Sequence, residues 1–289
     1  MNITKNQRRK PSWLKRNLPT GNEYEKVRKL LLKSHLHTVC QEAKCPNMWE
    51  CFSKNTATFM ILGSECTRNC RFCNIGTCLA PLPPDLEEPE RVAQAALDLG
   101  LTYVVVTSVT RDDLEDGGAE HFAMTIREIK KKLPCKTRVE VLIPDFKGSS
   151  TALKTVLDAG PDVLNHNIET IPSLYSKARP QADYQRSLDL LKKVSDSKTS
   201  IPVKSGLMVG LGENFDELEQ TMKDLFNHGC SILSIGQYLQ PSRQHLSVEK
   251  YYTPDEFVTL KKIAENIGFK KVASGPFVRS SYRAGELLG

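Results

Sequence analysis

The spacing of the cysteines between residues 40 and 73 constrains this chain more than any other feature of its sequence. Six of the nine cysteines lie in this stretch of 34 residues, in two groups of three. The first group has the pattern C-x4-C-x5-C and the second has the pattern C-x3-C-x2-C. In order, the residues are Cys40, Cys45 and Cys51, then Cys66, Cys70 and Cys73. The second pattern lets three thiolates on one short loop converge on a single metal centre.

The number of cysteines in each group limits what the groups can bind. Thiolate sulfur is a soft ligand that selects zinc, copper(I) or iron–sulfur clusters. A structural zinc site normally takes four protein ligands in two closely spaced pairs, and neither group has that form. Iron–sulfur cubanes also usually take four cysteines, so a group of three leaves one iron open for chemistry. Incomplete zinc knuckles and chance clustering are the plain alternatives, and six cysteines so close together argue against both.

Motifs across the chain carry a family resemblance. Phe72 stands directly before the last cysteine of the second group, and this loop resembles the signature of radical S-adenosylmethionine enzymes. The C-x4-C-x5-C group narrows the resemblance to the lipoyl synthase family. Two further segments support it, KPSWLK at residues 10–15 and RSSY at residues 279–282. The resemblance extends from about Lys10 to Ala284 and so covers nearly the whole chain.

Composition and charge set broader limits. The 289 residues are 26% charged and 39% hydrophobic, which suits one or two globular domains with an ample core. Apolar runs such as residues 59–62 are far shorter than the ~20 residues of a transmembrane helix, so we expect no membrane contact. The net charge of +6 is diffuse, and its densest run, at residues 130–132, suits an exposed helix end. The sequence contains no stripe of basic residues interleaved with aromatic residues, so it gives no indication of nucleic-acid binding.

The first 16 residues contain six Lys or Arg and no acidic residue, as transit peptides do. Because the family resemblance already begins at Lys10, we expect no long presequence to be removed. We also expect a cytoplasmic, reducing location, where clustered cysteines without a secretion signal are metal ligands before they are disulfides.

Alternating strand and helix patterns start at residue 56. The predicted strands are 56–62, 102–108, 138–143, 162–167, 203–209 and 231–235. After a Pro-rich linker at residues 81–89, one helix ends near residue 100; further helices are predicted at 118–133, 150–159, 184–194, 215–228 and 254–267, with an earlier one at 23–37. This order favours a parallel α/β sheet, and six units are too few for a closed barrel of eight. The rhythm leaves a doubly wound sheet open, whereas the resemblance implies a partial (β/α)6 barrel.

The same reading divides the chain into three parts. Residues 1–54 form an N-terminal extension that carries the first cysteine group, residues 55–274 form the partial barrel, and residues 275–289 form a C-terminal tail.

Polar residues and glycines gather just past the predicted strands, at the end of a barrel where enzymes keep their chemistry. Each has a plain alternative as a turn, a strand cap or a surface ion pair, but together they favour a cofactor pocket. The resemblance implies that they hold S-adenosylmethionine, with Arg179 suited to its carboxylate and Glu169 to its amine or ribose donors. The candidates are Thr107, Asp112, Gly117, Gly118, Asn165, Asn167, Glu169, Arg179, Gly210 and Gly212.

The resemblance also implies the reaction and its cofactors, which are two 4Fe-4S clusters and two S-adenosylmethionine molecules per lipoyl group. The open iron of the second cysteine group would bind S-adenosylmethionine and cleave it to a 5′-deoxyadenosyl radical, which removes hydrogen from an unactivated C–H bond. Sulfur would then enter at C6 and C8 of an octanoyl group that is amide-linked to a carrier lysine. The auxiliary cluster, held by the first group, would donate the sulfur and need rebuilding.

The first cysteine group lacks a fourth thiolate. Cys78, Cys135 and Cys230 fit neither motif, so we expect them not to be ligands. Two serines in a polar tail ordinarily form a turn or a cap, but the resemblance places a serine ligand here, with Ser281 preferred over Ser280. The tail would then fold back across the rim to reach the N-terminal extension.

The resemblance implies three kinds of partner. They are an octanoylated carrier domain, from a 2-oxoacid dehydrogenase subunit or a glycine-cleavage H protein, a low-potential electron donor, and iron–sulfur assembly proteins. A two-cluster electron carrier is a weaker alternative because such proteins are short, with four cysteines per cluster. An iron–sulfur regulator would need a binding domain that is not visible, and biotin synthase, which also inserts sulfur, fits the first cysteine group less well.

Overall fold

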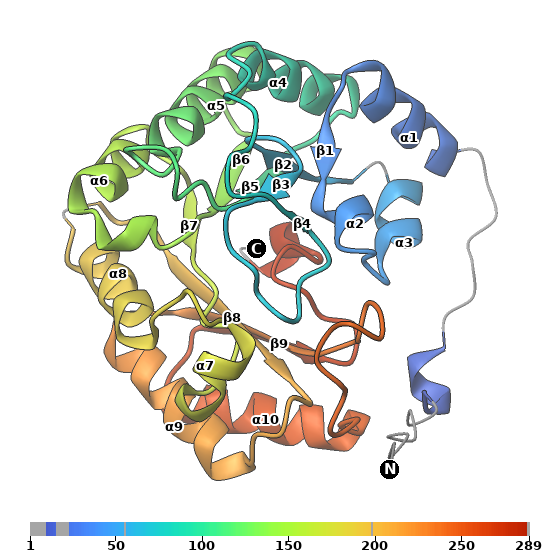
Figure 1. The fold of residues 1–289 in the computed structure, drawn as a ribbon, viewed down its shortest axis with the longest axis vertical. Helices are drawn as coiled ribbons and strands as arrows, with labels where there is room; N and C mark the ends of the chain where they lie inside the picture. Colours follow the sequence, from blue (N-terminus) through green and yellow to red (C-terminus); the bar gives the residue numbers. More distant parts are fainter. Residues whose placement is uncertain (1–9, 16–22, 55, 198, 288–289) are drawn as a thin grey trace.

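The computed structural model describes residues 10–15, 23–54, 56–197 and 199–287. Their main element is an eight-stranded sheet that curves into an open ring, in the order β1-β2-β5-β6-β7-β8-β9-β10 (Figure 1). The strands are β1 (His37–Thr38), β2 (Thr58–Ile61), β5 (Tyr103–Ser108), β6 (Arg138–Leu142), β7 (Val163–Asn165), β8 (Val203–Val209), β9 (Ile232–Gln237) and β10 (Lys271–Gly275). All neighbours from β2 to β10 pair in parallel, and β1 pairs antiparallel with β2. Within the described ranges β1 and β10 do not pair, so the barrel is open.

Helices follow the parallel strands and cover the outside of this sheet (Figure 1). They are α4 (Glu88–Asp98), α5 (Ala119–Lys132), α6 (Ser150–Asp158), α7 (Tyr175–Ala178), α8 (Tyr184–Asp196), α9 (Phe215–Asn227) and α10 (Pro254–Ile267). The N-terminal segment adds α1 (Glu23–Lys33), α2 (Val39–Glu42) and α3 (Met48–Ser53) on the open side, between α4 and α10. A separate two-stranded ribbon, β3 (Glu65–Cys66) with β4 (Gly76–Thr77), flanks the second cysteine group.

The expected partial barrel of six βα units is confirmed, since each predicted strand and each long predicted helix is present within a few residues of its predicted position. The sheet has one further parallel strand, β10, which the sequence did not reveal because only one of its five residues is buried. The boundary expected after residue 274 therefore falls inside β10. The Pro-rich linker is also shorter than expected, because Pro89 lies in the first turn of α4, where a missing N–H costs nothing.

Local sequence signals explain where the helices begin. Asn214 before α9 and Thr253 before α10 each form a capping box with a glutamate three residues later. Pro254 occupies the first turn of α10, and Gly268 ends that helix with a positive φ of 120°. These signals depend only on neighbouring residues, which is why the helices were predictable.

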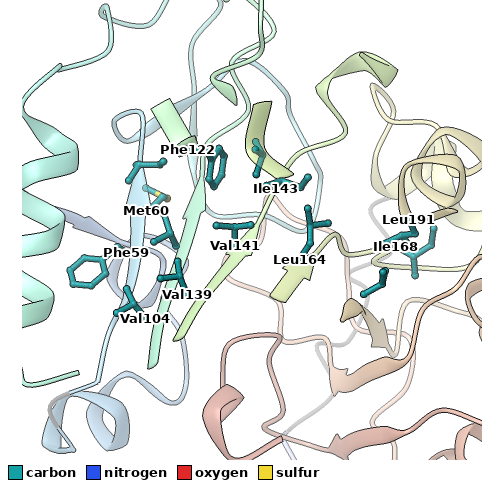
Figure 2. Packing of buried hydrophobic residues seen from close by; sticks show 14 of the residues in the cluster. Phe59, Met60, Val104, Phe122, Val139, Val141, Ile143, Leu164, Ile168 and Leu191 are labelled. Atoms are coloured by element: carbon teal, nitrogen blue, oxygen red, sulfur yellow. The ribbon is translucent and has the colours of Figure 1, made fainter. Parts of the chain in front are cut away.

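The two faces of the sheet are chemically different. The outer face is apolar, and Val104, Val139 and Val141 are fully buried beneath the helices, as part of the core shown in Figure 2. The concave face instead carries a buried ion pair, in which Lys204 Nζ on β8 donates to the two carboxylate oxygens of Glu140 on β6 at 2.8 and 3.1 Å. Tyr103 Oη and Asn165 Nδ2 donate to the same carboxylate at 2.5 and 3.1 Å. Strands β5 to β8 are therefore joined by one polar network inside the barrel.

The segment after β10, red in Figure 1, lies at the centre of the ring. It runs along the inner side of β8 and β9 at two glycines: a Cβ on Gly206 would lie 2.7 Å from Ser280 Oγ, and a Cβ on Gly236 would collide with the carbonyl of Val278. The tail does reach the N-terminal extension, as expected. Its path differs from the expected one, because it passes through the barrel interior and not across the rim.

Among the described residues, we find no helix whose length and apolar character would let it cross a membrane.

We predict that Gly118→Ala destabilises the fold strongly. Gly118 precedes α5 with φ of 89°, and an added Cβ would collide with the Leu62 side chain. Left-handed strain plus overpacking should lower the free energy of unfolding by about 2–4 kcal/mol. Gly100→Ala is the matched control, because Gly100 has φ of 64° but open space around its Cβ position; it should cost only about 1 kcal/mol. Urea unfolding of the two variants measures the difference, and equal losses would contradict the proposed clash.

Candidate functional site

The second cysteine group lies on a loop that begins at the end of β3. The Sγ of Cys66 accepts hydrogen bonds from the backbone N–H groups of Arg68, at 3.4 Å, and Thr110, at 3.3 Å. These two hydrogen bonds fix the position of the Cys66 sulfur between the loop and the end of β5. The backbone N–H of Cys78 donates to the carbonyl of Cys66 at 3.0 Å, so the far end of the loop returns to its start.

A buried arginine within this loop ties it to the barrel. Arg68 donates twice to the carboxylate of Asp112, at 2.6 and 2.9 Å, and once to Asp145, at 2.7 Å. Asp145 is fully buried. Burial alone would raise the pKa of Asp145, but the hydrogen bond and charge of Arg68 outweigh it and lower the pKa to about 2. The pair therefore remains ionised and fixes the loop over the carboxyl ends of β5 and β6.

The three thiols of this loop line one cavity of about 200 Å³ at the carboxyl ends of the strands. Four of the residues that the sequence proposed for S-adenosylmethionine line the same cavity, and they are Thr107, Asn167, Glu169 and Arg179. Burial raises the pKa of Cys73 to about 12, and it raises the pKa of Cys70 against the opposing charge of Arg179. Thiols held this way need a cation close by to become thiolates.

Glu169 and Arg179 are held rigidly beside the thiols. Glu169 has a positive φ of 68°, and its backbone N–H and C=O bond to Gly206 and Met208 of β8 at 3.0 and 2.8 Å. Burial raises the pKa of Glu169, while the neighbouring Arg179 opposes that rise. Arg179 donates to the carbonyl of Asn167 at 3.1 Å and to the hydroxyl of Tyr175 at 3.0 Å. A strained backbone at a cavity wall is typical of a binding site.

Three residues that line this cavity have a buried polar atom with no hydrogen-bond partner among the described residues. The atoms are Arg179 Nε, His166 Nε2 and Ser108 Oγ. Burial and the charge of Arg179 lower the pKa of His166 to about 4, so its ring is neutral at pH 7. Buried polar groups are normally satisfied, and such a gathering indicates a polar ligand. The donors and the thiols therefore fit a cluster with S-adenosylmethionine beside it.

The other proposed residues lie outside the lining of this cavity and have structural contacts. Asp112 binds Arg68, and Asn165 binds Glu140. Gly117 and Gly118 pack against Phe146 and Leu62 at the start of α5. At the end of β8, the Glu213 carboxylate binds the N–H groups of Gly210 and Leu211 at 2.5 and 2.9 Å, while Gly212 adopts φ of 121°. Each glycine thus serves a turn or a close approach of chain segments.

The first cysteine group lies on the two short helices of the N-terminal extension and on the turn between them. Cys40 is in α2, Cys51 is in α3, and the N–H of Cys45 donates to the carbonyl of Cys40 at 3.0 Å. Burial raises the pKa of Cys40 to about 12, and the negative charges of Cys45 and Cys51 add to this effect, so the three sulfurs are close enough to repel one another as thiolates. As the side chains stand, no three His, Cys, Asp or Glu in the described part of the chain are arranged to hold a single metal ion.

The two serines of the tail face different surroundings. Ser281 and Cys51 line a second cavity of about 340 Å³, which includes the starts of β2 and β5 and so opens at the opposite end of these strands. Ser280 instead donates from Oγ to Asn167 Oδ1 at 2.7 Å, on the side of the first cavity. The Glu50 carboxylate accepts from Tyr282 Oη at 3.0 Å and from Arg283 at 3.0 Å, which joins the tail to α3.

The remaining cysteines differ from the two groups. Cys135 is exposed, and Cys230 is buried with its Sγ 3.2 Å from the carbonyl of Ile232, where burial raises its pKa to about 12. Cys78 follows the loop of the second cysteine group but does not line the cavity that Cys66, Cys70 and Cys73 line.

Sequence reasoning missed Arg68, Asp145 and His166. The available signal was the position of Arg68 between the first two cysteines of the loop, which places its side chain close to the proposed ligands.

Comparison with protein families identifies the class first. The model of the radical SAM superfamily matches residues 60–225, more than half of the chain, and the model of the N-terminal domain of lipoyl synthase matches residues 2–45. The fold agrees: HydG, a maturase of the FeFe-hydrogenase, superposes with a TM-score of 0.60 at 16% identity, over 86% of this chain and 66% of that one. SuiB of Streptococcus suis bound to S-adenosylmethionine gives 0.56 at 12% identity, over 87% and 54%. This chain is a member of the radical S-adenosylmethionine superfamily.

Curated relatives then define the family. The lipoyl synthase of Desulfotalea psychrophila is 58% identical over 279 residues, which cover 96% of this chain and 93% of the relative. That of Caldanaerobacter subterraneus is 56% identical over 96% of each chain. The chain belongs to the lipoyl synthase family. The expectations of a sulfur-inserting sulfurtransferase with 4Fe-4S clusters and S-adenosylmethionine, acting on a lipoyl carrier, are confirmed by this membership.

We predict that Arg68→Met destabilises the chain because it strands the buried Asp145 carboxylate. Removing one partner of a buried ion pair costs about 3–5 kcal/mol. Arg186→Met is the control, since Arg186 contacts the same carboxylate at 3.4 Å from a side chain that is 36% exposed; its loss should cost less than about 1 kcal/mol. Denaturant unfolding of both variants measures this, and the prediction is wrong if Arg186→Met is the more damaging change.

Proposed function

We propose that this chain converts an octanoyl group, amide-linked to a lysine of a lipoyl carrier domain, into a lipoyl group by placing sulfur at C6 and C8. The observation that carries the proposal is the separation of the two cysteine groups: Cys66, Cys70 and Cys73 line one cavity, and Cys51 of the first group lines another with Ser281, at the opposite end of β2 and β5. One cavity has room and unsatisfied donors for a cofactor, and the other is completed by the tail. Such a division suits a reaction in which one cluster activates the cofactor and another is consumed.

In this proposal the second cysteine group, Cys66, Cys70 and Cys73, holds the cluster that cleaves S-adenosylmethionine. When bound, that cluster supplies the electron that cleaves S-adenosylmethionine. Arg179, whose Nε lacks a partner, offers a donor to the methionyl carboxylate, and Glu169 offers an acceptor to the amine or ribose. Asn167 and Thr107 complete the polar wall beside them. The apolar and backbone groups around this wall keep water from the reacting atoms.

The auxiliary cluster has Cys40, Cys45 and Cys51 as ligands in the same proposal, with Ser281 as the fourth. Support comes from the cavity that Ser281 shares with Cys51, and from the bond that already engages Ser280 with Asn167. A serine oxygen is a harder donor than a thiolate and a poorer match for iron. That corner is therefore the one that opens most easily when sulfur leaves.

The partners and the setting complete the proposal. The carrier domain belongs to a 2-oxoacid dehydrogenase subunit or to a glycine-cleavage H protein. A low-potential electron donor reduces the cluster that cleaves S-adenosylmethionine. Iron–sulfur assembly proteins rebuild the auxiliary cluster in the cytoplasm. The proposed division is an extension at 1–54, a barrel at 55–274 and a tail at 275–289, which leaves the last residue of β10, Gly275, at the start of the tail. Residues 1–9, 16–22, 55, 198 and 288–289 lie outside the described ranges.

The decisive experiment is mass spectrometry of an octanoyl-lysine peptide incubated with the loaded enzyme, S-adenosylmethionine and a reductant. The product should gain two sulfur atoms, with no loss of hydrogen while the reductant keeps it as the dithiol and with two hydrogens fewer after oxidation to the disulfide. Two molecules of 5′-deoxyadenosine should form for each lipoyl group. Cleavage of S-adenosylmethionine with no mass change in the peptide would refute sulfur insertion.

One prediction concerns the second cysteine group and the cleavage of S-adenosylmethionine. Replacing Cys66, Cys70 and Cys73 together by Ala should leave roughly half of the iron and abolish 5′-deoxyadenosine formation, because only one of two clusters is lost. Replacing Cys78, Cys135 and Cys230 one at a time by Ala should leave the iron content unchanged. Iron and sulfide analysis tests both statements, and cleavage by the triple variant would overturn the assignment.

The second prediction separates the two serines. Ser281→Ala should leave S-adenosylmethionine cleavage measurable while abolishing sulfur insertion, and Ser281→Cys should hold the cluster more tightly and insert less sulfur. Ser280→Ala is the control for a lost hydroxyl in the same segment. Lipoyl formation at the parent rate by Ser281→Ala would remove Ser281 from the ligand set.

A further inference from the structure

The ion pair inside the barrel has a third partner, which lies in the tail. Lys204 Nζ donates to the backbone carbonyl of Ser280 at 2.6 Å, in addition to its two contacts with Glu140. Its side chain is 1% exposed, as is that of Glu140. An ammonium group has three donors, and all three are used here. The lysine therefore connects the strand framework to a segment 76 residues further along the chain.

The pair is also fixed in place by its neighbours. Tyr103 Oη and Asn165 Nδ2 donate to the Glu140 carboxylate, so this carboxylate accepts from three different strands. Burial and the Glu140 charge together raise the pKa of Tyr103, which keeps its hydroxyl a donor. Four hydrogen bonds thus converge on the two oxygens of one carboxylate, and such a network rigidifies the groups that it joins. The Lys204 ammonium is thus held at one position relative to β5, β6 and β7.

The tail has little freedom at the point where Lys204 binds it. Gly206, two residues further along β8, leaves just enough room for Ser280, and Gly236 leaves room for the Val278 carbonyl. On the other side, Asn47 Nδ2 donates to the Phe277 carbonyl at 2.7 Å, and Tyr282 Oη binds Glu50. Between these points the backbone turns, so that Ser280 Oγ meets Asn167 while Ser281 lies in the cavity with Cys51.

We propose that Lys204, held by Glu140, is a positioning residue that fixes the backbone of residues 279–282 inside the barrel and so sets which serine faces the first cysteine group. The ammonium binds a carbonyl and touches neither thiol group, so it acts through the chain and not on a ligand. A shift of one residue in one direction would present Ser280 to Cys51 and Arg279 to Asn167, and a shift in the other direction would present Tyr282 to Cys51. Lys204 opposes either shift because it holds the Ser280 carbonyl. The consequence for catalysis rests on the proposed role of Ser281.

The test compares three variants of the full chain with both clusters loaded. Lys204→Met alone would strand the Glu140 carboxylate, so the informative variant is the double change Lys204→Met with Glu140→Gln. This double change removes both charges, while the Gln oxygen can accept from Asn165 and the Gln NH2 group can donate to the Tyr103 hydroxyl. Lys204→Arg is the conservative variant, because a guanidinium can still bind both the carboxylate and the carbonyl. Glu88→Gln is the matched control, a buried carboxylate paired with His121 that contacts no residue of the tail.

The first readout is hydrogen–deuterium exchange in the peptide that covers residues 276–287. Exchange should become at least tenfold faster in the double variant and stay near the parent rate in Lys204→Arg and in Glu88→Gln. This measurement depends on the tail alone, so it decides whether Lys204 holds the tail even if the chain proves to have another activity. Parent-like exchange in the double variant would overturn the proposal.

The second readout is the ratio of lipoyl product to 5′-deoxyadenosine. The double variant should cleave S-adenosylmethionine within threefold of the parent rate but form at least tenfold less lipoyl product, and Lys204→Arg should restore the ratio. A released tail combined with an unchanged ratio would show that the position of residues 279–282 does not matter for sulfur insertion, and this too would overturn the proposal. An equal fall in both products would point to general damage and count against a positioning role.

Discussion

The buried contact between Lys204 and Glu140 determines how the inside of this barrel is used. A barrel interior is usually filled by layers of branched apolar side chains. Here the middle layer is a carboxylate that accepts from three strands and an ammonium that also holds a carbonyl. Replacing such a pair by well-packed apolar side chains is often neutral or stabilising, so stability alone does not explain it. The distinctive property of this ion pair is that it leaves room inside the barrel for the tail and binds the tail at one point, the Ser280 carbonyl.

Burial of the thiols makes their deprotonation depend on metal binding. Cys40 and Cys73 have pKa values raised to about 12 by burial, so at neutral pH their sulfurs keep their protons until a cation takes the protons' place. Metal binding and thiol deprotonation are then one event. The loop of the second cysteine group is held by Arg68 and its two carboxylates, so the proposed cluster would enter a loop whose shape is already fixed.

Sequence reasoning succeeded where the signal is local and failed where it depends on distant contacts. The capped helices and the apolar strands were predictable from neighbouring residues, and so were the cysteine groups. Strand β10 was missed because Lys271–Gly275 has a polar, glycine-containing sequence and a single buried residue. The path of the tail was misjudged because it depends on the absent side chains of Gly206 and Gly236, which no pattern near Ser280 reveals. The same holds for Arg68, whose partner Asp145 is 77 residues away.

The hydrogen bonds from Tyr282 and Arg283 to Glu50 join residues that are 232 and 233 positions apart in the chain. During synthesis, the extension with its three cysteines leaves the ribosome first, and Ser281, Tyr282 and Arg283 leave it only after every strand of the barrel. The wall that these residues add to the cavity beside Cys51 cannot exist on a nascent chain. Under the proposed ligand assignment, iron that reaches the first cysteine group early would meet three sulfurs and open water, and the order of translation would delay completion of the cluster until the fold is formed.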